Sequence, residues 1–157
     1  MKIVIRPPYT SFDRLKLPIV IKSILNTLYK SGADMSIAPE YTDCVTAIRY
    51  ILSQTSDYIL PRAYIGDMPR MMIDAGATEV SIQSAQPGDI IFFERMSFTH
   101  GHYMIAHIGI IISESEFFHS SPHHRGGQIS SYHTQEYESI ILDESYLSIA
   151  SDPRHHA

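Results

Sequence analysis

The only cysteine of the chain stands where a helix is expected to begin. Thr42 or Asp43 is a suitable N-cap, and the apolar residues that follow recur at helical spacing: Val45, Ile48, Ile51 and Leu52. Cys44 therefore falls in the first turn, where unpaired N–H groups and the helix dipole favour a thiolate. A cysteine in this position is a candidate nucleophile. The alternative is an inert core residue, because free cysteines are among the most buried side chains.

Two histidines further along the chain lie on segments with the pattern of a β-hairpin, residues 106–112 and 117–120. If the turn is the three residues 113–115, Gly109 pairs with His119. His119 then lies diagonally opposite His107 on the paired strand. The backbones of such diagonal neighbours are about 7–8 Å apart, and long side chains can meet across that distance. A two-residue turn would instead separate the two rings to opposite faces.

A thiol and two imidazoles together are the groups that a thiol hydrolase needs. One imidazole takes the proton from the thiol and later gives it to the leaving amine, while a third polar group fixes the tautomer of that imidazole. The sequence therefore points to acyl chemistry at Cys44, on the condition that the hairpin has the three-residue turn.

The composition describes a globular chain and excludes several classes of protein. The chain has 157 residues, 44% of them hydrophobic and 18% charged, which suits one domain spanning residues 1–157. A net charge of −5 without a Lys/Arg cluster argues against nucleic-acid binding. No apolar run reaches membrane-spanning length, and residues 1–8 lack the hydrophobic region of a signal peptide. We expect a cytoplasmic protein, or one exported without a recognisable signal peptide.

Helical patterns come first in the chain and strand patterns second. After a short strand at 3–5, helices are expected at 18–29, 43–54 and 67–74; strands are expected at 90–93, 106–112, 117–120, 129–132 and 138–142. This order indicates an α+β domain. The first helix is expected to pack on the core, since its few lysines argue against a membrane anchor.

Five short motifs occur in a fixed order between residues 41 and 121: Asp43-Cys44, Leu60-Pro61-Arg62, Pro87 to Phe93, His107 to Ile110 and Phe117 to Ser120. They resemble the Asp-Cys-Ser-Gly, Leu-Pro-Arg, Pro-Gly-Asp-Leu-Val-Phe-Phe, His-Val-Gly-Ile and Phe-Ile-His-Ala motifs of the NlpC/P60 family. That family consists of papain-like cysteine peptidases best known for cutting bacterial cell-wall peptides. The motif-bearing core covers about residues 41–142.

The resemblance implies a papain-like fold in which N-terminal helices pack on an antiparallel β-sheet. It implies Cys44 as nucleophile, His107 as general base and His119 as the residue that orients His107. The expected reaction is hydrolysis of an amide bond, most simply in a peptidoglycan stem peptide, through an acyl-enzyme and without a cofactor. The backbone N–H of Cys44 is the expected oxyanion donor.

The chain departs from the family pattern around the cysteine. Val45 and Thr46 replace the Ser-Gly pair, and the upstream Tyr-x-Trp-Gly-Gly run is not found. In the family, that tyrosine and the aspartate before the cysteine grip the free amine of the stem peptide. Asp43, Tyr41 and Arg62 are the candidate substrate-binding residues here. Residues 94–103 are expected to form an inserted, histidine-bearing loop at one wall of the cleft.

Three other interpretations stay open. A metal site would draw on His100, His102, His123, His124 and His133, but no acid or thiol accompanies them at zinc-like spacing, so no metal is predicted. The same triad also suits deamidation or acyl transfer on a protein. A degenerate cleft would serve as a binding module without catalysis.

Overall fold

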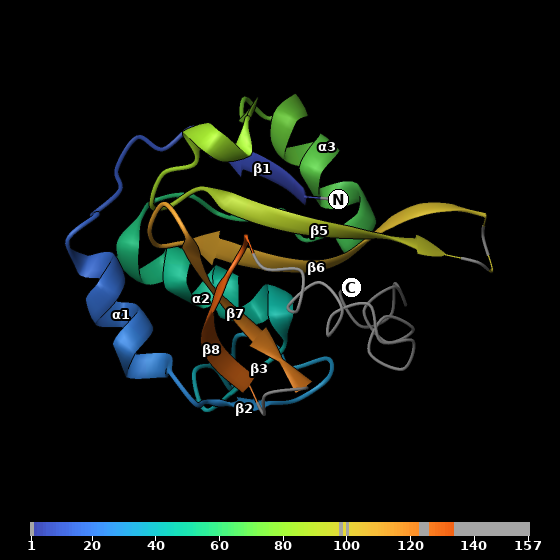
Figure 1. The fold of residues 1–157 in the computed structure, drawn as a ribbon. Coiled ribbons are helices and arrows are strands. Elements are labelled where there is room, and N and C mark those ends of the chain that lie inside the picture. Colours follow the sequence, from blue (N-terminus) through green and yellow to red (C-terminus); the bar gives the residue numbers. More distant parts are fainter. Residues whose placement is uncertain (1, 98, 100, 123–125, 134–157) are drawn as a thin grey trace.

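Helices and one large sheet form the part of the chain that the computed structural model describes, residues 2–97, 99, 101–122 and 126–133. The helices are α1 (Lys16–Ile24), α2 (Cys44–Thr55) and α3 (Met68–Asp74), with two short 3-10 helices, η1 (Ile65–Asp67) and η2 (Ile82–Ser84). The strands are β1 (Lys2–Arg6), β2 (Leu28–Tyr29), β3 (Tyr41–Thr42), β4 (Thr78–Val80), β5 (Ile90–Ser97), β6 (His102–Ile111), β7 (Glu116–Ser121) and β8 (Gly126–Ser131). The prediction of an α+β fold is confirmed (Figure 1).

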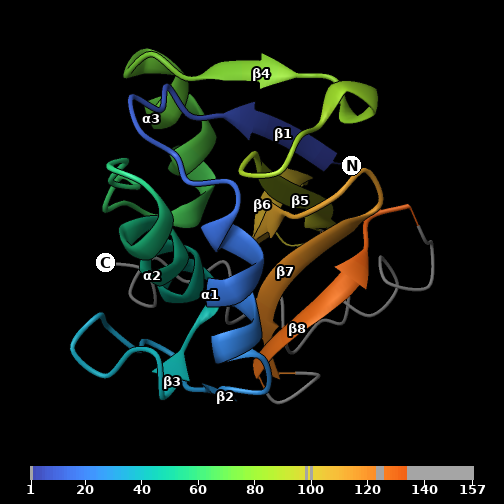
Figure 2. The same cartoon turned by 90° about the vertical axis from the view of Figure 1, so that its left-hand side faces the viewer.

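The eight described strands follow the order β3-β2-β8-β7-β6-β5-β1-β4. Neighbouring strands run antiparallel, except for the short parallel pair β2–β3. Figure 2 shows the three helices gathered on one side of this sheet. Among the described residues, no helix is both long enough and apolar enough to span a bilayer.

Alternation along the central strands divides the core between the two faces of the sheet. On β5, Ile90 and Phe92 belong to the main cluster, which also holds the buried side chains of the three helices. Ile91 and Phe93 belong to a smaller cluster on the other face, together with Phe117. A strand buried on both faces reads as a continuous apolar run, as residues 90–93 do.

The first helix is shorter than its sequence pattern indicates. It ends at Ile24 because Leu25 is extended and Asn26 takes a positive φ of 64°, which breaks helical geometry. The Asn26 N–H donates to the carbonyl of Gly127 at 2.8 Å. Residues 28–29 then pair in the sheet as β2, so the prediction of a helix over 18–29 is wrong in its last turn.

The predicted loop at 94–103 is also wrong, because β5 and β6 continue through most of it. Their pairing runs on from Glu94 opposite Ile105 to Ser97 opposite His102, past an irregularity after Phe93. The two strands thus extend beyond the rest of the sheet as a twisted ribbon (Figure 1). His102, expected in a loop, is the first residue of β6. The strand predicted at 138–142 lies outside the described residues.

A buried carboxylate fixes the turn that leads into β5. Asp89 is 3% exposed and receives two hydrogen bonds from the Arg6 guanidinium, at 3.0 and 2.9 Å, and one from the Gln86 N–H at 2.8 Å. The turn of the Pro-Gly-Asp motif is therefore tied to β1, and β5 enters the sheet in a fixed register.

Replacing this carboxylate is expected to destabilise the fold. In Asp89→Ala, a half-buried guanidinium and a backbone N–H lose their acceptor, so urea unfolding should report a loss of about 2–4 kcal/mol. Asp74→Ala removes an exposed carboxylate at the end of α3 and is the matched control, with an expected change within about 0.5 kcal/mol. Equal effects of the two substitutions would contradict the structural role of Asp89.

Candidate active site

Cys44 is the first residue of α2, as the sequence predicts, and Asp43 is the N-cap. The Asp43 carboxylate accepts the Thr46 N–H at 2.7 Å, which satisfies one of the unpaired donors of the first turn. Cys44 is only 1% exposed and packs in the main hydrophobic cluster. The sulfur is therefore closed to solvent in this structure.

The hairpin has the three-residue turn on which the sequence argument depends. Ile111 pairs with Phe117 and Ile110 with Phe118, and the Ile112 N–H donates to Glu116 at 3.0 Å. The same register sets Gly109 opposite His119. The predicted turn at 113–115 is confirmed.

This register brings the two predicted histidines into contact. His107 Nε2 and His119 Nδ1 lie 2.8 Å apart, and the rings meet edge-on with centroids 4.9 Å apart. Both side chains are fully buried. They pack against Phe93 and Phe117, which belong to the smaller cluster. The two imidazoles thus form one hydrogen-bonded unit in a low-dielectric environment.

Strand β8 supplies two further partners, which the sequence analysis missed. His119 Nε2 lies 3.0 Å from Ser130 Oγ and 3.0 Å from Gln128 Nε2. A hydroxyl can accept or donate, whereas an amide nitrogen only donates. The sequence contains a sign of these partners. Gln128 directly precedes the strand predicted at 129–132, and side chains two positions apart on a strand, such as Gln128 and Ser130, lie on the same face.

These partners define two alternative proton arrangements. If the Gln128 amide donates to His119 Nε2, His119 Nδ1 carries a proton and His107 Nε2 must accept it, which leaves the proton of His107 on Nδ1. If His119 Nε2 instead donates to Ser130, the Gln128 amide must turn its nitrogen away from that proton; His119 Nδ1 then accepts from His107 Nε2, and Nδ1 of His107 carries the lone pair. Only the second arrangement makes His107 a base at Nδ1.

The cysteine segment is tied to the histidine strand directly. Thr42 Oγ1 lies 3.0 Å from Ser120 Oγ, so the residue two before Cys44 contacts the residue after His119. Helix α2 also packs against both β6 and β7. Packing and hydrogen bonding therefore hold the start of α2 against β6 and β7, whereas the His107 and His119 rings pack against Phe93 and Phe117 of the smaller cluster.

Burial, more than the helix start, determines the state of the thiol. It raises the pKa of Cys44 well above the ordinary value, and the neighbouring Asp43 charge raises it further. The backbone N–H groups of Val45 and Cys44 lower it, which is the effect expected of a helix start, but they are outweighed. No imidazole of the described residues is among these causes. The resting thiol is thus neutral.

The candidate substrate-binding residues have different surroundings. Asp43 is buried and caps α2, while Tyr41 is 38% exposed on β3, with the Lys30 ammonium 5.8 Å from its ring centroid. Arg62 is exposed. Hydrogen bonds from Ser36 lower the pKa of Asp34, and the Arg62 charge lowers it further. Burial lowers the pKa of Arg49, and the Arg62 charge again adds to the effect. Arg62 thus lies within electrostatic reach of the loop that holds Asp34 and of Arg49 on α2.

A tyrosine that the sequence analysis did not select lies beside the cysteine. Burial raises the pKa of Tyr29 above its ordinary value, and the Cys44 thiolate, where it forms, and the Asp43 carboxylate raise it further. Tyr29 pairs in the sheet with Thr42, the residue two before Cys44. Thr46 helps to shape the same region, since its hydroxyl donates to the Ala33 carbonyl at 2.6 Å in the segment between β2 and β3.

Among the described residues, no group of three His, Cys, Asp or Glu side chains is suited to hold a metal ion. His102 Nδ1 lies 3.1 Å from the Tyr103 carbonyl, and His133 Nε2 lies 3.0 Å from the Glu114 carbonyl. His100, His123 and His124 lie outside the described residues.

The sequence model of the NlpC/P60 family matches residues 27–144, about three quarters of the chain. The chain belongs to the NlpC/P60 family. A comparison with curated protein sequences gave no match.

Solved structures share the fold of this NlpC/P60 chain. The NlpC/P60 domain of the peptidoglycan hydrolase SagA is 20% identical, with a TM-score of 0.56 over 76% of this chain and 89% of that one. NlpC1 from Trichomonas vaginalis is 18% identical, with a TM-score of 0.62 over 83% of this chain and 43% of that one. At these identities the likeness concerns the fold alone.

Family membership also explains how Tyr29 could have been found. The segment Tyr29-Lys30-Ser31-Gly32-Ala33 keeps the tyrosine and the first glycine of the family's Tyr-x-Trp-Gly-Gly run. Ser31 and Ala33 stand where the run has its tryptophan and its second glycine, so the full run is not present. Tyr29 is therefore added to the candidate substrate-binding residues.

The raised pKa predicts the pH dependence of Cys44 alkylation. Because iodoacetamide reacts with the thiolate, a raised pKa moves the midpoint of the rate profile of the native protein above that of a free thiol, about 8.5. The same protein unfolded in urea should return to the ordinary midpoint. A native midpoint below about 7 would contradict the neutral resting thiol.

Gly109→Ala tests the close packing beneath the histidine pair. An added methyl would lie 2.5 Å from the Phe117 ring and 2.8 Å from the Phe118 carbonyl oxygen. Alanine in an unobstructed strand stabilises by about 0.5–1 kcal/mol, whereas overpacking here should cost about 1–3 kcal/mol in urea unfolding. A stabilised variant would contradict the close approach.

Proposed function

We propose that Cys44, His107 and His119 form a catalytic triad that hydrolyses an amide bond. The observation that carries the proposal is the 2.8 Å contact between His107 Nε2 and His119 Nδ1 on strands packed against the helix of the only cysteine. Family membership supports it, since NlpC/P60 proteins are typically hydrolases of the cysteine peptidase type.

In the proposed first step, His107 Nδ1 takes the thiol proton as the sulfur attacks the substrate carbonyl. The new C–S bond forms while the carbonyl electrons move to oxygen. Because the resting thiol is neutral, His107 acts as a general base during attack rather than as half of a preformed ion pair. His119 accepts from His107 Nε2–H and donates to Ser130, which stabilises the imidazolium.

In the following steps, the C–N bond breaks and the leaving amine takes the proton from His107. Water then attacks the thioester with His107 again as base, and the acid product leaves with Cys44 restored. The backbone N–H groups of Cys44 and Val45 lie close enough to the sulfur to lower its pKa, and the proposed oxyanion site at the start of α2 uses the Cys44 N–H.

We further propose a peptidoglycan stem peptide as the substrate. One structural neighbour is the domain of a peptidoglycan hydrolase. Asp43 and Tyr29 lie beside Cys44, where a carboxylate and a phenol suit the free amine end of a peptide. Tyr41 and Arg62 stay candidates for outer contacts.

Digestion of purified muropeptides followed by mass spectrometry tests the proposal. Cys44→Ala and His107→Gln should each lower the hydrolysis rate by about 10³-fold or more, because the members of a triad act as a unit. His102→Gln is the matched control; it changes a histidine on the same strand that is exposed, and it should keep the rate of the native protein.

The products separate the proposal from its alternatives. A mass increase of about 1 Da without cleavage would identify deamidation and overturn hydrolysis. Binding of muropeptides without any turnover would make the chain a binding module. Undiminished turnover in His107→Gln would remove His107 from the mechanism.

A further inference from the structure

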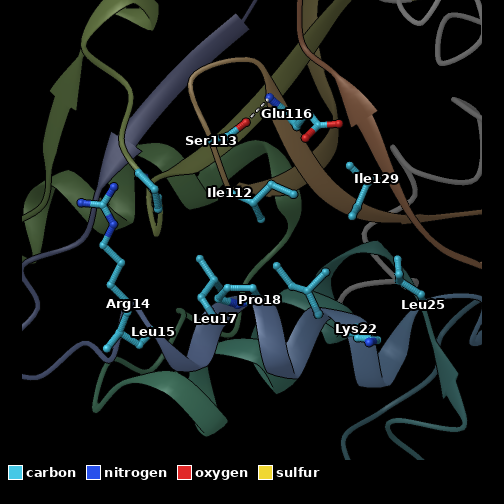
Figure 3. A pocket seen from close by; sticks show the side chains of 12 residues that line it. Arg14, Leu15, Leu17, Pro18, Lys22, Leu25, Ile112, Ser113, Glu116 and Ile129 are labelled. Carbon is cyan, nitrogen blue, oxygen red and sulfur yellow. Dashed lines mark hydrogen bonds between the residues drawn. The ribbon is translucent and has the colours of Figure 1, made fainter.

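A groove of about 410 Å³ lies between α1 and the β6–β7 turn, away from the candidate active site (Figure 3). Its lining is mostly aliphatic: Leu17, Pro18, Ile21, Leu25, Ile112 and Ile129. Arg14 and Lys22 lie at its α1 side, and Glu116 lies on the opposite wall. The groove contains none of the candidate catalytic residues.

The outer face of α1 carries two of the most exposed aliphatic side chains of the described chain. Leu15 is 84% exposed and Ile19 is 68% exposed. Leu15 is the N-cap and already has helical φ and ψ. At about 100° per residue, these two side chains point in directions about 40° apart, so they form one stripe.

Basic side chains flank this stripe on both sides. In the same projection, Lys22 lies on one side of Leu15 and Ile19, and Lys16 lies on the other. Arg14 precedes the helix at the mouth of the groove. No ion pair joins these three side chains to another described residue. The carboxylates nearest to these three cations are those of Asp13, which accepts the Lys16 N–H, and Glu116 on the opposite wall of the groove, so cations are in excess.

We propose that α1 docks on an anionic lipid bilayer, with Leu15 and Ile19 inserted among the acyl chains. Lys16, Lys22 and Arg14 then meet the lipid phosphates, and the aliphatic groove continues the apolar surface behind them. A helix with exposed aliphatic residues between cations is the type that lies in a membrane interface.

The helix predicted at 18–29 contains a single cation, Lys22, and for that reason a membrane anchor is not expected from the sequence. In the structure, the helix begins at Lys16, and the exposed stripe begins at Leu15. The predicted boundary at residue 18 left out Arg14, Leu15 and Lys16. These are one of the two stripe residues and two of the three cations. Ile19 and Lys22 were within the predicted helix.

Co-sedimentation with vesicles tests the proposal on the full chain. Binding to phosphatidylglycerol vesicles is expected, with at least tenfold weaker partitioning to phosphatidylcholine vesicles and a loss on raising the salt concentration. The double variant Leu15→Ser/Ile19→Ser should lose about tenfold or more, and Lys16→Gln/Lys22→Gln should lose the preference for phosphatidylglycerol. All four side chains are exposed, so circular dichroism should be unchanged.

Ile59→Ser is the matched control, because Ile59 is 82% exposed but lies outside α1 and its groove. It should bind vesicles as the native protein does. The proposal is overturned if the native protein ignores phosphatidylglycerol vesicles, or if Leu15→Ser/Ile19→Ser binds them undiminished. It is also overturned if α1 instead pairs two copies, seen in light scattering as a dimer that the double variant abolishes. Muropeptide hydrolysis does not enter this test.

Discussion

The hydrogen bond between His107 and His119 depends on a hairpin whose register admits no slip. A shift by one residue would send one imidazole to the other face of the sheet. The turn at 113–115 sets that register, and Gly109 lets Phe117 approach the strand closely enough to support the His119 ring. Both rings are buried, so hydrogen bonds within the protein decide which of their nitrogens carry protons.

The cysteine is governed by two opposing effects of its position. The helix start offers N–H groups that favour a thiolate, but close packing and the Asp43 charge favour the thiol. In this structure, burial dominates. In the proposed mechanism, His107 therefore activates the thiol, and Cys44 must be uncovered before a substrate reaches it. Tyr29 and the segment that Thr46 holds are the neighbours best placed to take part.

Local patterns were enough to predict the centre of the fold. The N-cap at Asp43, the buried strand at 90–93 and the hairpin parity follow from short-range rules, and each agrees with the structure. What failed depended on pairing between segments, some of them distant in sequence. Helix α1 ends early because Asn26 bonds to Gly127, and 94–103 continues the ribbon because each strand supplies the other's hydrogen bonds. Likewise, Gln128 and Ser130 come within hydrogen-bonding distance of His119 only because β8 pairs with β7.

The most direct test of the account is the tautomer of His107, measured by ¹⁵N NMR of the imidazole nitrogens at neutral pH. The proposed mechanism requires the proton of His107 on Nε2, donated to His119 Nδ1, with the lone pair on Nδ1. We expect a protonated Nε2 signal coupled to the His119 ring, with the His119 proton on Nε2 towards Ser130. A proton on Nδ1 of His107, with His119 Nε2 accepting from Gln128, would contradict the role of His107 as the general base.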